Sequence, residues 1–305
     1  MRVLITGGAG YIGTVLTWQL SELPDISEIL IYDNLSKGHH NFFLGERYPH
    51  SKIKFIEGEI LDSRRLKKQM AECDVVIHLA AKVTTPFSNT DPHFFEQVNH
   101  WGTAEVVYAA EESNISKFIY LSSTSVYGAS KDVATEETTP NPRTFYGVSK
   151  LRGEEHVDRL KALKNAVVLR VGNVYGPSRS MRFDAVINKF MFEANFSNRI
   201  QIFGSGKQSR AFIHVNYLVN CIRDIVMHEV PSGTFNLVDK NLQILDIVDV
   251  LKVLYPSLEF MFTNQHMKLR ELRVSPESQL FDHIPKIHSG DFADELKEFK
   301  GRFAF

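Results

Sequence analysis

The sequence predicts an α/β fold, in which a parallel, doubly wound sheet carries helices on both faces and a smaller lobe follows it. Through residue 176, short apolar runs rich in β-branched residues alternate with longer segments of helical periodicity. Such strand–helix alternation is typical of a parallel sheet with crossover helices. After Gly176-Pro177 the alternation is lost and the segments become mixed. We therefore expect a second, smaller lobe in the C-terminal part.

The strands expected in the first part are short and are bounded by polar or glycine-containing turns. They cover residues 3–6, 28–32, 54–57, 75–79, 118–122 and 167–171. Helical patterns lie near 11–23, 62–71, 91–114 and 145–163. Beyond them we expect a loop and one helix within 178–206, a strand at 200–203, and a strand at 234–238 that returns to the main sheet.

The division into domains follows from these elements. We expect residues 1–176 to form the sheet domain, with 209–250 partly returning to it. Residues 177–208 and 251–305 would form the smaller, interleaved lobe that binds the substrate.

The composition excludes several classes of protein. With 305 residues, 43% of them hydrophobic and 23% charged, the chain is neither disordered nor fibrous. A net charge of −1 without a basic stripe indicates no binding to nucleic acid or to an anionic membrane. Cys73 and Cys221 lie far apart, which predicts free thiols and no metal site. No secretory signal or apolar membrane span is evident, so we expect a cytoplasmic protein.

A glycine-rich turn joins the first strand to the first helix. Its sequence, Thr6-Gly-Gly-Ala-Gly-Tyr-Ile-Gly13, places glycines at Gly7, Gly10 and Gly13. Glycine lets the backbone approach a pyrophosphate, and the helix N-terminus offers unpaired N–H groups. Asp33 closes the second strand, where a carboxylate accepts the ribose hydroxyls of NAD and repels the 2′-phosphate of NADP. Each feature alone also fits an ordinary turn, but together they predict a Rossmann-type NAD site.

A tyrosine four residues before a lysine occurs three times, as Tyr48/Lys52, Tyr127/Lys131 and Tyr146/Lys150. Pro49 interrupts the first interval and Gly128 the second, so neither pair is expected on a regular helix. The third pair lies in a helical pattern, where positions four apart share a face.

There the lysine ammonium would favour the phenolate and lower the pKa of Tyr146. A tyrosine tuned in this way can exchange a proton with a sugar hydroxyl near neutral pH. Ser123, at the end of the fifth strand, could hydrogen-bond the same hydroxyl. By itself the motif also fits an ordinary helix surface.

The motifs occur in a characteristic order. Besides the glycine turn they are Asp33-Asn-Leu35, His78-Leu-Ala-Ala81, Asn99 in Val-Asn-His-Trp-Gly-Thr, Ser122-Ser-Thr-Ser-Val-Tyr-Gly128, Tyr146-Gly-Val-Ser-Lys150 and Leu169-Arg-Val-Gly-Asn-Val-Tyr-Gly-Pro177. The set closely resembles the extended short-chain dehydrogenase/reductase family, in particular its nucleotide-sugar epimerase/dehydratase group of the UDP-glucose 4-epimerase kind. The resemblance covers essentially the whole chain.

The resemblance implies an NAD-dependent enzyme and assigns roles to individual residues. Ser123, Tyr146 and Lys150 are similar to the catalytic triad of the family, and Asn99 to its supporting fourth member. The NAD contacts that it implies are Gly7, Gly10, Tyr11, Ile12, Gly13, Asp33, Asn34, Glu59, Ile60, Leu79, Ala80, Ala81, Asn99, Tyr146 and Lys150. The implied substrate contacts are Ser123, Thr124, Tyr146, Asn173, Arg210 and Arg270, with Lys268 or Arg273 as alternatives to Arg270.

The sequence departs from the family pattern in four places. Glu59 replaces an aspartate at the adenine site, which is a conservative change. Ala211 replaces an aspartate, Asn216-Tyr217 stand where acidic residues are common, and Gly172 stands where many epimerases carry an aromatic residue. The last three leave the details of the substrate pocket open.

The residues after Ser123 bear on the type of reaction. Related dehydratases carry Asp-Glu there and decarboxylases keep a glutamate, whereas this chain has Thr124-Ser125. Hydroxyl groups cannot do carboxylate chemistry at neutral pH, so dehydration is disfavoured. We expect a nucleotide-sugar epimerase that acts at C4 through a transient 4-keto sugar. The alternatives are a 4-dehydrogenase or 4-keto-sugar reductase on the same scaffold, or a non-catalytic dinucleotide sensor, which the presence of Tyr146 and Lys150 disfavours.

The helix expected at 91–114 carries an apolar face made by Phe94, Phe95, Val98 and Trp101. Such a face fits a buried core. In the family, the equivalent helix and the one with the catalytic tyrosine build the four-helix bundle of a homodimer. We therefore expect a homodimer.

Overall fold

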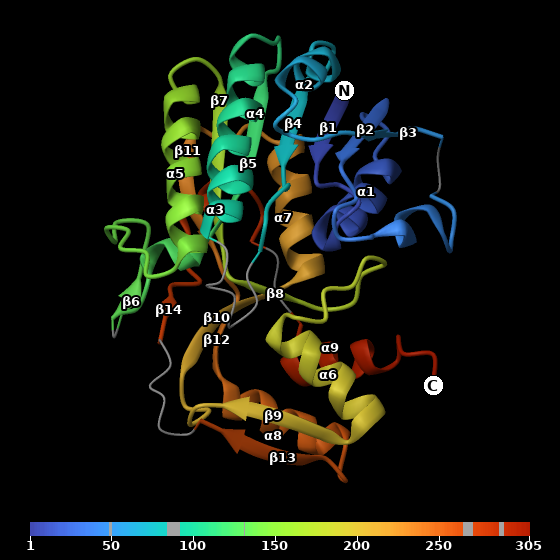
Figure 1. Cartoon of the computed structure of the whole chain (residues 1–305), viewed down its shortest axis with the longest axis vertical. Helices are drawn as coiled ribbons and strands as arrows, with labels where there is room; N and C mark the ends of the chain where they lie inside the picture. The colour runs from blue at the N-terminus through green and yellow to red at the C-terminus, as the bar shows by residue number, and fades with distance from the viewer. Residues whose placement is uncertain (49–50, 84–91, 131, 265–270, 287–289) are drawn as a thin grey trace.

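The computed structural model describes residues 1–48, 51–83, 92–130, 132–264, 271–286 and 290–305, and its centre is a seven-stranded sheet (Figure 1). The strand order is β11-β7-β5-β4-β1-β2-β3, and all neighbouring strands run parallel. The strands are β1 (Arg2–Thr6), β2 (Glu28–Asp33), β3 (Ile53–Glu57), β4 (Val75–His78), β5 (Lys117–Ser123), β7 (Asn165–Val171) and β11 (Gly233–Leu237). The predicted doubly wound α/β fold is confirmed.

Helices cover both faces of this sheet. On one face, α1 (Tyr11–Glu22) and α7 (Val215–Met227) pack against each other over an apolar cluster. On the other face lie α2 (Ser63–Met70), α4 (Gly102–Glu111) and α5 (Phe145–Leu160), over a second cluster (Figure 1). Both clusters are buried, because the central parallel strands carry apolar side chains on both faces of the sheet.

The helix predicted over 91–114 is not a regular helix. Residue 91 lies outside the described residues, and the chain continues as α3 (Pro92–Phe95), the π-helical segment η2 (Glu96–Trp101) and α4, which ends at Glu111. A π-helical turn is wider than an α-helical one and often occurs at functional sites. Here it includes the buried Asn99.

A smaller lobe lies below the carboxyl edge of the sheet (Figure 1). It contains α6 (Val186–Ser197), α8 (Ile244–Leu254) and α9 (Phe292–Lys300), together with β9 (Arg199–Phe203) paired with β13 (Glu259–Thr263). The domain boundary expected at residue 250 falls inside α8. Because Ile247 and Leu251 of α8 pack in one cluster with α6 and β9, the whole helix belongs to the lobe.

A three-stranded sheet connects the two parts. It runs β12 (Lys240–Gln243), β10 (Ser209–His214), β8 (Asn173–Tyr175), and the sequence patterns do not predict β8. The remaining elements are β6 (Val133–Ala134) paired with β14 (Arg273–Val274), and the 3₁₀ turns η1 (His40–Phe43), η3 (Thr124–Tyr127) and η4 (Gln279–Asp282). Within the described ranges, no helix has the length and apolar character that crossing a membrane requires.

Candidate active site

The glycine-rich turn lies at the carboxyl edge of the central sheet, between β1 and α1. Gly7 has φ +71°, and a Cβ atom there would lie 2.7 Å from the Cα of Ala80. A Cβ on Gly13 would lie 2.5 Å from the Cα of Gly8. These neighbours are backbone atoms and cannot rotate away, so only glycine allows the turn to pack this closely. The first turn of α1 therefore presents its free N–H groups at the sheet edge, with Gly10 and Ile12 beside them.

Tyr11 joins this turn to the lower lobe. Its hydroxyl donates to the carbonyl of Gly176 at 2.7 Å and accepts from the side-chain amide of Asn188 at 3.2 Å. The hydroxyls of Ser178 and Ser180 donate to the carbonyls of Tyr11 and Ala9, both at 2.7 Å. The phenol of Tyr11 is thus engaged within the chain, which leaves its backbone for the expected cofactor contact.

Asp33 closes β2 beside the turn. Its carboxylate accepts backbone N–H bonds from Ala9 at 3.0 Å and from Leu35 at 2.8 Å. Burial raises the pKa of Asp33, and these two hydrogen bonds oppose that rise. The structure therefore holds the acid in a fixed orientation at the end of the strand.

A cavity of about 320 Å³ adjoins Asp33 and is lined by Asn34, Glu57, Gly58, Glu59 and Arg65. The side-chain amide of Asn34 donates to Glu59 at 2.7 Å, and the other oxygen of Glu59 accepts the N–H of Ile60 at 2.9 Å. The expected residues Asn34, Glu59 and Ile60 thus lie together. Leu79, Ala80 and Ala81 follow β4, and Ala80 contacts the glycine turn. The glycine turn, the carboxylate of Asp33 and the cavity beside Glu59 follow one another along the edge of the sheet. This arrangement fits the adenosine half of a dinucleotide.

The Tyr146/Lys150 pair lies on the first two turns of α5. The side chain of Thr144 caps this helix by accepting the N–H of Gly147 at 3.0 Å. Tyr146 is half-buried, meets the ring of Phe95 edge to face at 6.3 Å, and is hydrogen-bonded to Ser123. The structure thus brings the predicted Tyr146 and Ser123 together.

The electrostatics of the pair differ from the expectation. Burial raises the pKa of Tyr146, and the charge of Arg182 and the Ser123 hydrogen bond only partly oppose this. The prediction that Lys150 lowers the pKa of Tyr146 is therefore wrong for this arrangement. The amine of Lys150 instead lies 4.2 Å from the centre of the Tyr120 ring. Burial lowers the pKa of Lys150 to about 7, against the opposing charge of Glu154.

Hydroxyl side chains follow Ser123. The Ser123 oxygen accepts the N–H of Ser125 at 3.2 Å and caps η3. Thr124 is buried, and the hydroxyl oxygen of Ser125 is buried without a hydrogen-bond partner among the described residues. No carboxylate belongs to this turn, because η3 reads Thr-Ser-Val-Tyr.

Asn99 joins α5 to the chain that follows β4. Its amide accepts the N–H of Lys82 at 2.7 Å and donates to the Lys82 carbonyl at 2.9 Å and to the Ser149 hydroxyl at 3.1 Å. The Ser149 hydroxyl in turn donates to the carbonyl of Tyr146 at 2.9 Å. Asn99 therefore orients the first turn of α5.

Two of the expected substrate residues lie on neighbouring strands of the connecting sheet. Asn173 begins β8, which pairs with β10, the strand of Arg210, and its amide donates to the Ala211 carbonyl at 2.9 Å. Arg270 and its alternative Lys268 lie outside the described residues. The other alternative, Arg273, is exposed at the start of β14. The preceding residue, Leu272, donates its N–H to the Ser209 carbonyl at 3.2 Å, which places Arg273 near the start of β10.

Three charged residues close to the candidate site were not singled out by the sequence analysis. Arg182, in the loop before α6, places a positive charge near both Tyr146 and Tyr11. Glu154 and Arg170 form a buried ion pair below Lys150. Glu154 stands four residues after Lys150, a helical spacing that could have revealed it.

The tyrosines of the other two tyrosine–lysine pairs make hydrogen bonds and ring contacts within the fold. The Tyr127 hydroxyl donates to Asn236 at 2.8 Å and accepts from Arg170 at 3.1 Å. Tyr48 packs against Phe42 and lies below the guanidinium of Arg179. Lys131 lies outside the described residues.

Comparison with protein families shows a match over residues 3–237 to the NAD-dependent epimerase/dehydratase family. Among curated relatives, dTDP-D-glucose 4,6-dehydratase of Mus musculus is 33% identical over 247 residues, which cover 77% of this chain and 67% of the relative. UDP-glucose 4-epimerase of Mycolicibacterium smegmatis is 32% identical over 228 residues, covering 72% and 71%. A dehydratase and an epimerase are thus similar to this chain to almost the same degree, so sequence identity alone does not distinguish the two reactions.

Solved structures agree on the fold. UDP-N-acetylglucosamine 4-epimerase from Methanobrevibacter ruminantium M1, in complex with UDP-N-acetylmuramic acid, superposes with a TM-score of 0.86 at 26% identity, covering 98% of this chain and 97% of that one. UDP-glucuronic acid 4-epimerase from Bacillus cereus, in complex with UDP-glucuronic acid and NAD, gives a TM-score of 0.88 at 24% identity, covering 99% and 98%.

Proposed function

The chain belongs to the NAD-dependent epimerase/dehydratase family, a family of enzymes, and from this premise we propose that it is a nucleotide-sugar epimerase that acts at C4 of the sugar. The observation that carries the choice is the turn η3 beside Tyr146. Elimination of water from a sugar needs both an acid and a base near the reacting carbons. Thr124 and Ser125 supply only hydroxyl groups there. Epimerisation through a 4-keto sugar needs one proton acceptor and a hydride carrier, which this site can supply.

NAD, when bound, would accept a hydride from the sugar and return it. Its pyrophosphate would lie against the glycine turn, and its ribose hydroxyls would donate to Asp33. The adenine would enter the cavity beside Glu59. The similar solved structure from Bacillus cereus contains NAD, which supports this placement.

The residues of the chain would handle the proton. Ser123 would orient the O4 hydroxyl, and Tyr146 would take its proton and later return it to the 4-keto sugar. Because burial raises the pKa of Tyr146, the positive charge of Arg182, which acts against that rise, would help to bring this transfer near neutral pH. The amine of Lys150 would contact the bound NAD. The guanidinium of Arg210 suits the pyrophosphate of the sugar nucleotide, and Asn173 lies beside it.

The test is a panel of UDP-, dTDP-, GDP- and CDP-hexoses incubated with the purified protein. Proton NMR follows product stereochemistry, and absorbance near 340 nm follows NADH. We expect one hexose epimer to convert to the other without added NAD and without net NADH. A 4-keto-6-deoxy product would establish a dehydratase instead, and stoichiometric NADH with a keto sugar would establish a dehydrogenase.

Matched tyrosine variants separate the chemistry from the fold. Tyr146→Phe should lower kcat by at least 100-fold, because it removes the proton acceptor. Tyr48→Phe removes a hydroxyl from a similar tyrosine–lysine pair, but Tyr48 packs in the cluster on the α1 side of the sheet and should keep full activity. Equal activity of Tyr146→Phe and wild type would refute the role of Tyr146.

We also propose that the protein is a homodimer. The apolar face expected on the helix at 91–114 is divided: Phe95 is buried, whereas Phe94 and Trp101 are 41% and 55% exposed. The exposed pair would cover the same elements of a second copy. In light scattering after size exclusion, the wild type should be dimeric and Trp101→Asp monomeric. Phe260→Asp, on exposed β13 of the lower lobe, is the control that should stay dimeric.

A further inference from the structure

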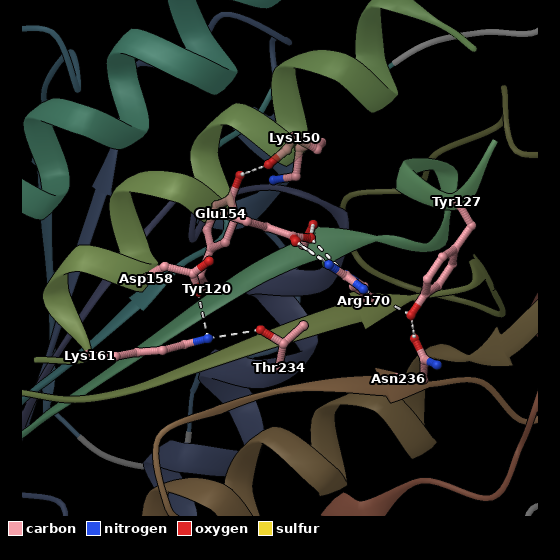
Figure 2. A network of polar contacts seen from close by, with 10 residues as sticks. Tyr120, Tyr127, Lys150, Glu154, Asp158, Lys161, Arg170, Thr234 and Asn236 are labelled. Carbon is pink, nitrogen blue, oxygen red and sulfur yellow. Dashed lines mark hydrogen bonds and ion pairs between the residues drawn. The ribbon is translucent and has the colours of Figure 1, made fainter. Parts of the chain in front are cut away.

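A buried ion pair lies directly below the lysine of the active site (Figure 2). Arg170, on β7, donates to Glu154 of α5 at 2.7 Å and through its Nε at 3.2 Å. The two side chains are only 9% and 4% exposed. Burying two charges requires close geometry and further hydrogen bonds to offset the lost hydration.

Those further bonds fix the carboxylate from several strands. The hydroxyl of Ser122, on β5, donates to Glu154 at 2.5 Å. Arg170 continues to the hydroxyl of Tyr127, which reaches Asn236 on β11 (Figure 2). The position of the Glu154 carboxylate is thus set by β5, β7 and the strand beyond them.

Lys150 stands one helical turn before Glu154 and is 2% exposed. On its own helix Tyr146 and Glu154 flank it; from β5 it faces the ring of Tyr120, against which His78 of β4 stacks. The pKa of His78 is lowered to about 3 by burial and by the charge of Lys150, so this imidazole is neutral. Burial raises the pKa of Tyr120 well above its usual range, so its phenol is neutral too. Among these described neighbours, the carboxylate of Glu154 is the group that can balance the ammonium.

We propose that Glu154 is a positioning residue for Lys150: its carboxylate, clamped by Arg170 and Ser122, favours the charged form of the buried amine, which the proposed contact with NAD uses. The use of the charged amine rests on the function proposed above. The effect of Glu154 on the amine can be measured without any substrate.

The size of the effect follows from the burial of the amine. Burial lowers the pKa of Lys150 to about 7, and Glu154 opposes this. Loss of an opposite charge at this range lowers an amine pKa by about one further unit. At pH 7.5 the charged fraction of Lys150 would then fall about eightfold.

The first experiment is a titration by NMR. Protein labelled with ¹³C at lysine Cε reports each amine, and Lys150→Met assigns the signal of Lys150. We expect its midpoint to fall by about one pH unit in Glu154→Gln. An unchanged midpoint would overturn the proposal.

A second variant separates this effect from a purely structural one. Glu154→Gln leaves Arg170 buried without its partner and can weaken the fold, whereas Glu154→Gln/Arg170→Met removes both charges. We expect the Lys150 midpoint to stay below the wild-type value in the double variant, because the carboxylate is still missing. A return to the wild-type midpoint would show that Glu154 only neutralises Arg170, and would overturn the proposal.

The pH profile of kcat then tests the link to catalysis. In the variants in which the titration midpoint of Lys150 is lowered, the alkaline limb of the pH profile of kcat should shift to lower pH by the same number of pH units, while KM stays unchanged. An alkaline limb that does not move, with a midpoint that does, would refute the catalytic use of Lys150 and leave the positioning by Glu154 supported.

Discussion

His78 makes the stability of this protein depend on pH in a way that can be calculated. The imidazole is 1% exposed and lies between the hydroxyls of Thr6 and Thr103, at 2.6 Å and 3.0 Å. Its pKa is about 3, lowered first by burial and then by the charge of Lys150, against about 6.5 in an unfolded chain. Between these two values the unfolded state binds more protons than the folded state. Stability is therefore full above about pH 6.5 and is lost as the pH falls toward 3.

The two pKa values give the magnitude. At pH 4 the linkage relation assigns to His78 a loss of about 3 kcal/mol in the free energy of unfolding, relative to pH 7. Urea unfolding followed by tryptophan fluorescence at both pH values measures this loss. In His78→Asn, which lacks the titrating ring, the loss between pH 7 and pH 4 should be smaller by about 3 kcal/mol. The exposed His40 supplies the control, since His40→Asn should keep the wild-type loss. If His78→Asn loses as much stability as the wild type, the reasoning about this imidazole is wrong.

Three further predictions concern the glycine-rich turn, the side-chain amide of Asn99 and the hydroxyl of Tyr127. Gly13→Ala should raise the Kd for NAD in calorimetry at least tenfold, because its Cβ would collide with the backbone of Gly8 at 2.5 Å; an unchanged Kd would contradict the close approach. Asn99→Ala should lower the free energy of unfolding by about 2–4 kcal/mol, since both backbone groups of Lys82 lose their partner; a thermal midpoint equal to that of the wild type would contradict this. Tyr127→Phe should lower the free energy of unfolding by about 1–3 kcal/mol, because Arg170 and Asn236 lose a hydrogen-bond partner; urea unfolding equal to that of the wild type would contradict this.

The central sheet was predictable because its strands are short apolar runs that end at turns. β1, β2 and β7 differ from the predicted ranges by one or two residues, and Gly233–Leu237 joins the sheet as a strand expected there. The strand β8 was not predictable, because three residues carry no periodicity. The π-helical segment depends on packing around Asn99, which a helical pattern in the sequence does not contain.

The candidate site, too, contains residues that the sequence predicts and residues that it does not. Gly7, Asp33, Tyr146 and Ser123 follow from motifs that are contiguous in the sequence, and the structure brings them to one edge of the sheet. Arg182 comes from a loop whose path is set by contacts across the lobes, so its charge near Tyr146 has no local signal. The pKa of Tyr146 was also out of reach, since it depends on how deeply the ring is covered.

The path of the chain between the two parts limits how they can be exchanged. The chain leaves the central sheet after β7, builds α6 and β9, returns through α7 and β11, and leaves again for α8 and α9. A fragment cut at residue 176 would therefore lack both the edge strand β11 and the helix that packs on α1. A chimaera that takes its lower lobe from a relative has to replace two separate segments at once. Recombination at a single crossover would instead split the core on the α1 side of the sheet, so new substrate preferences in this scaffold are more accessible through changes of individual residues than through exchange of a module.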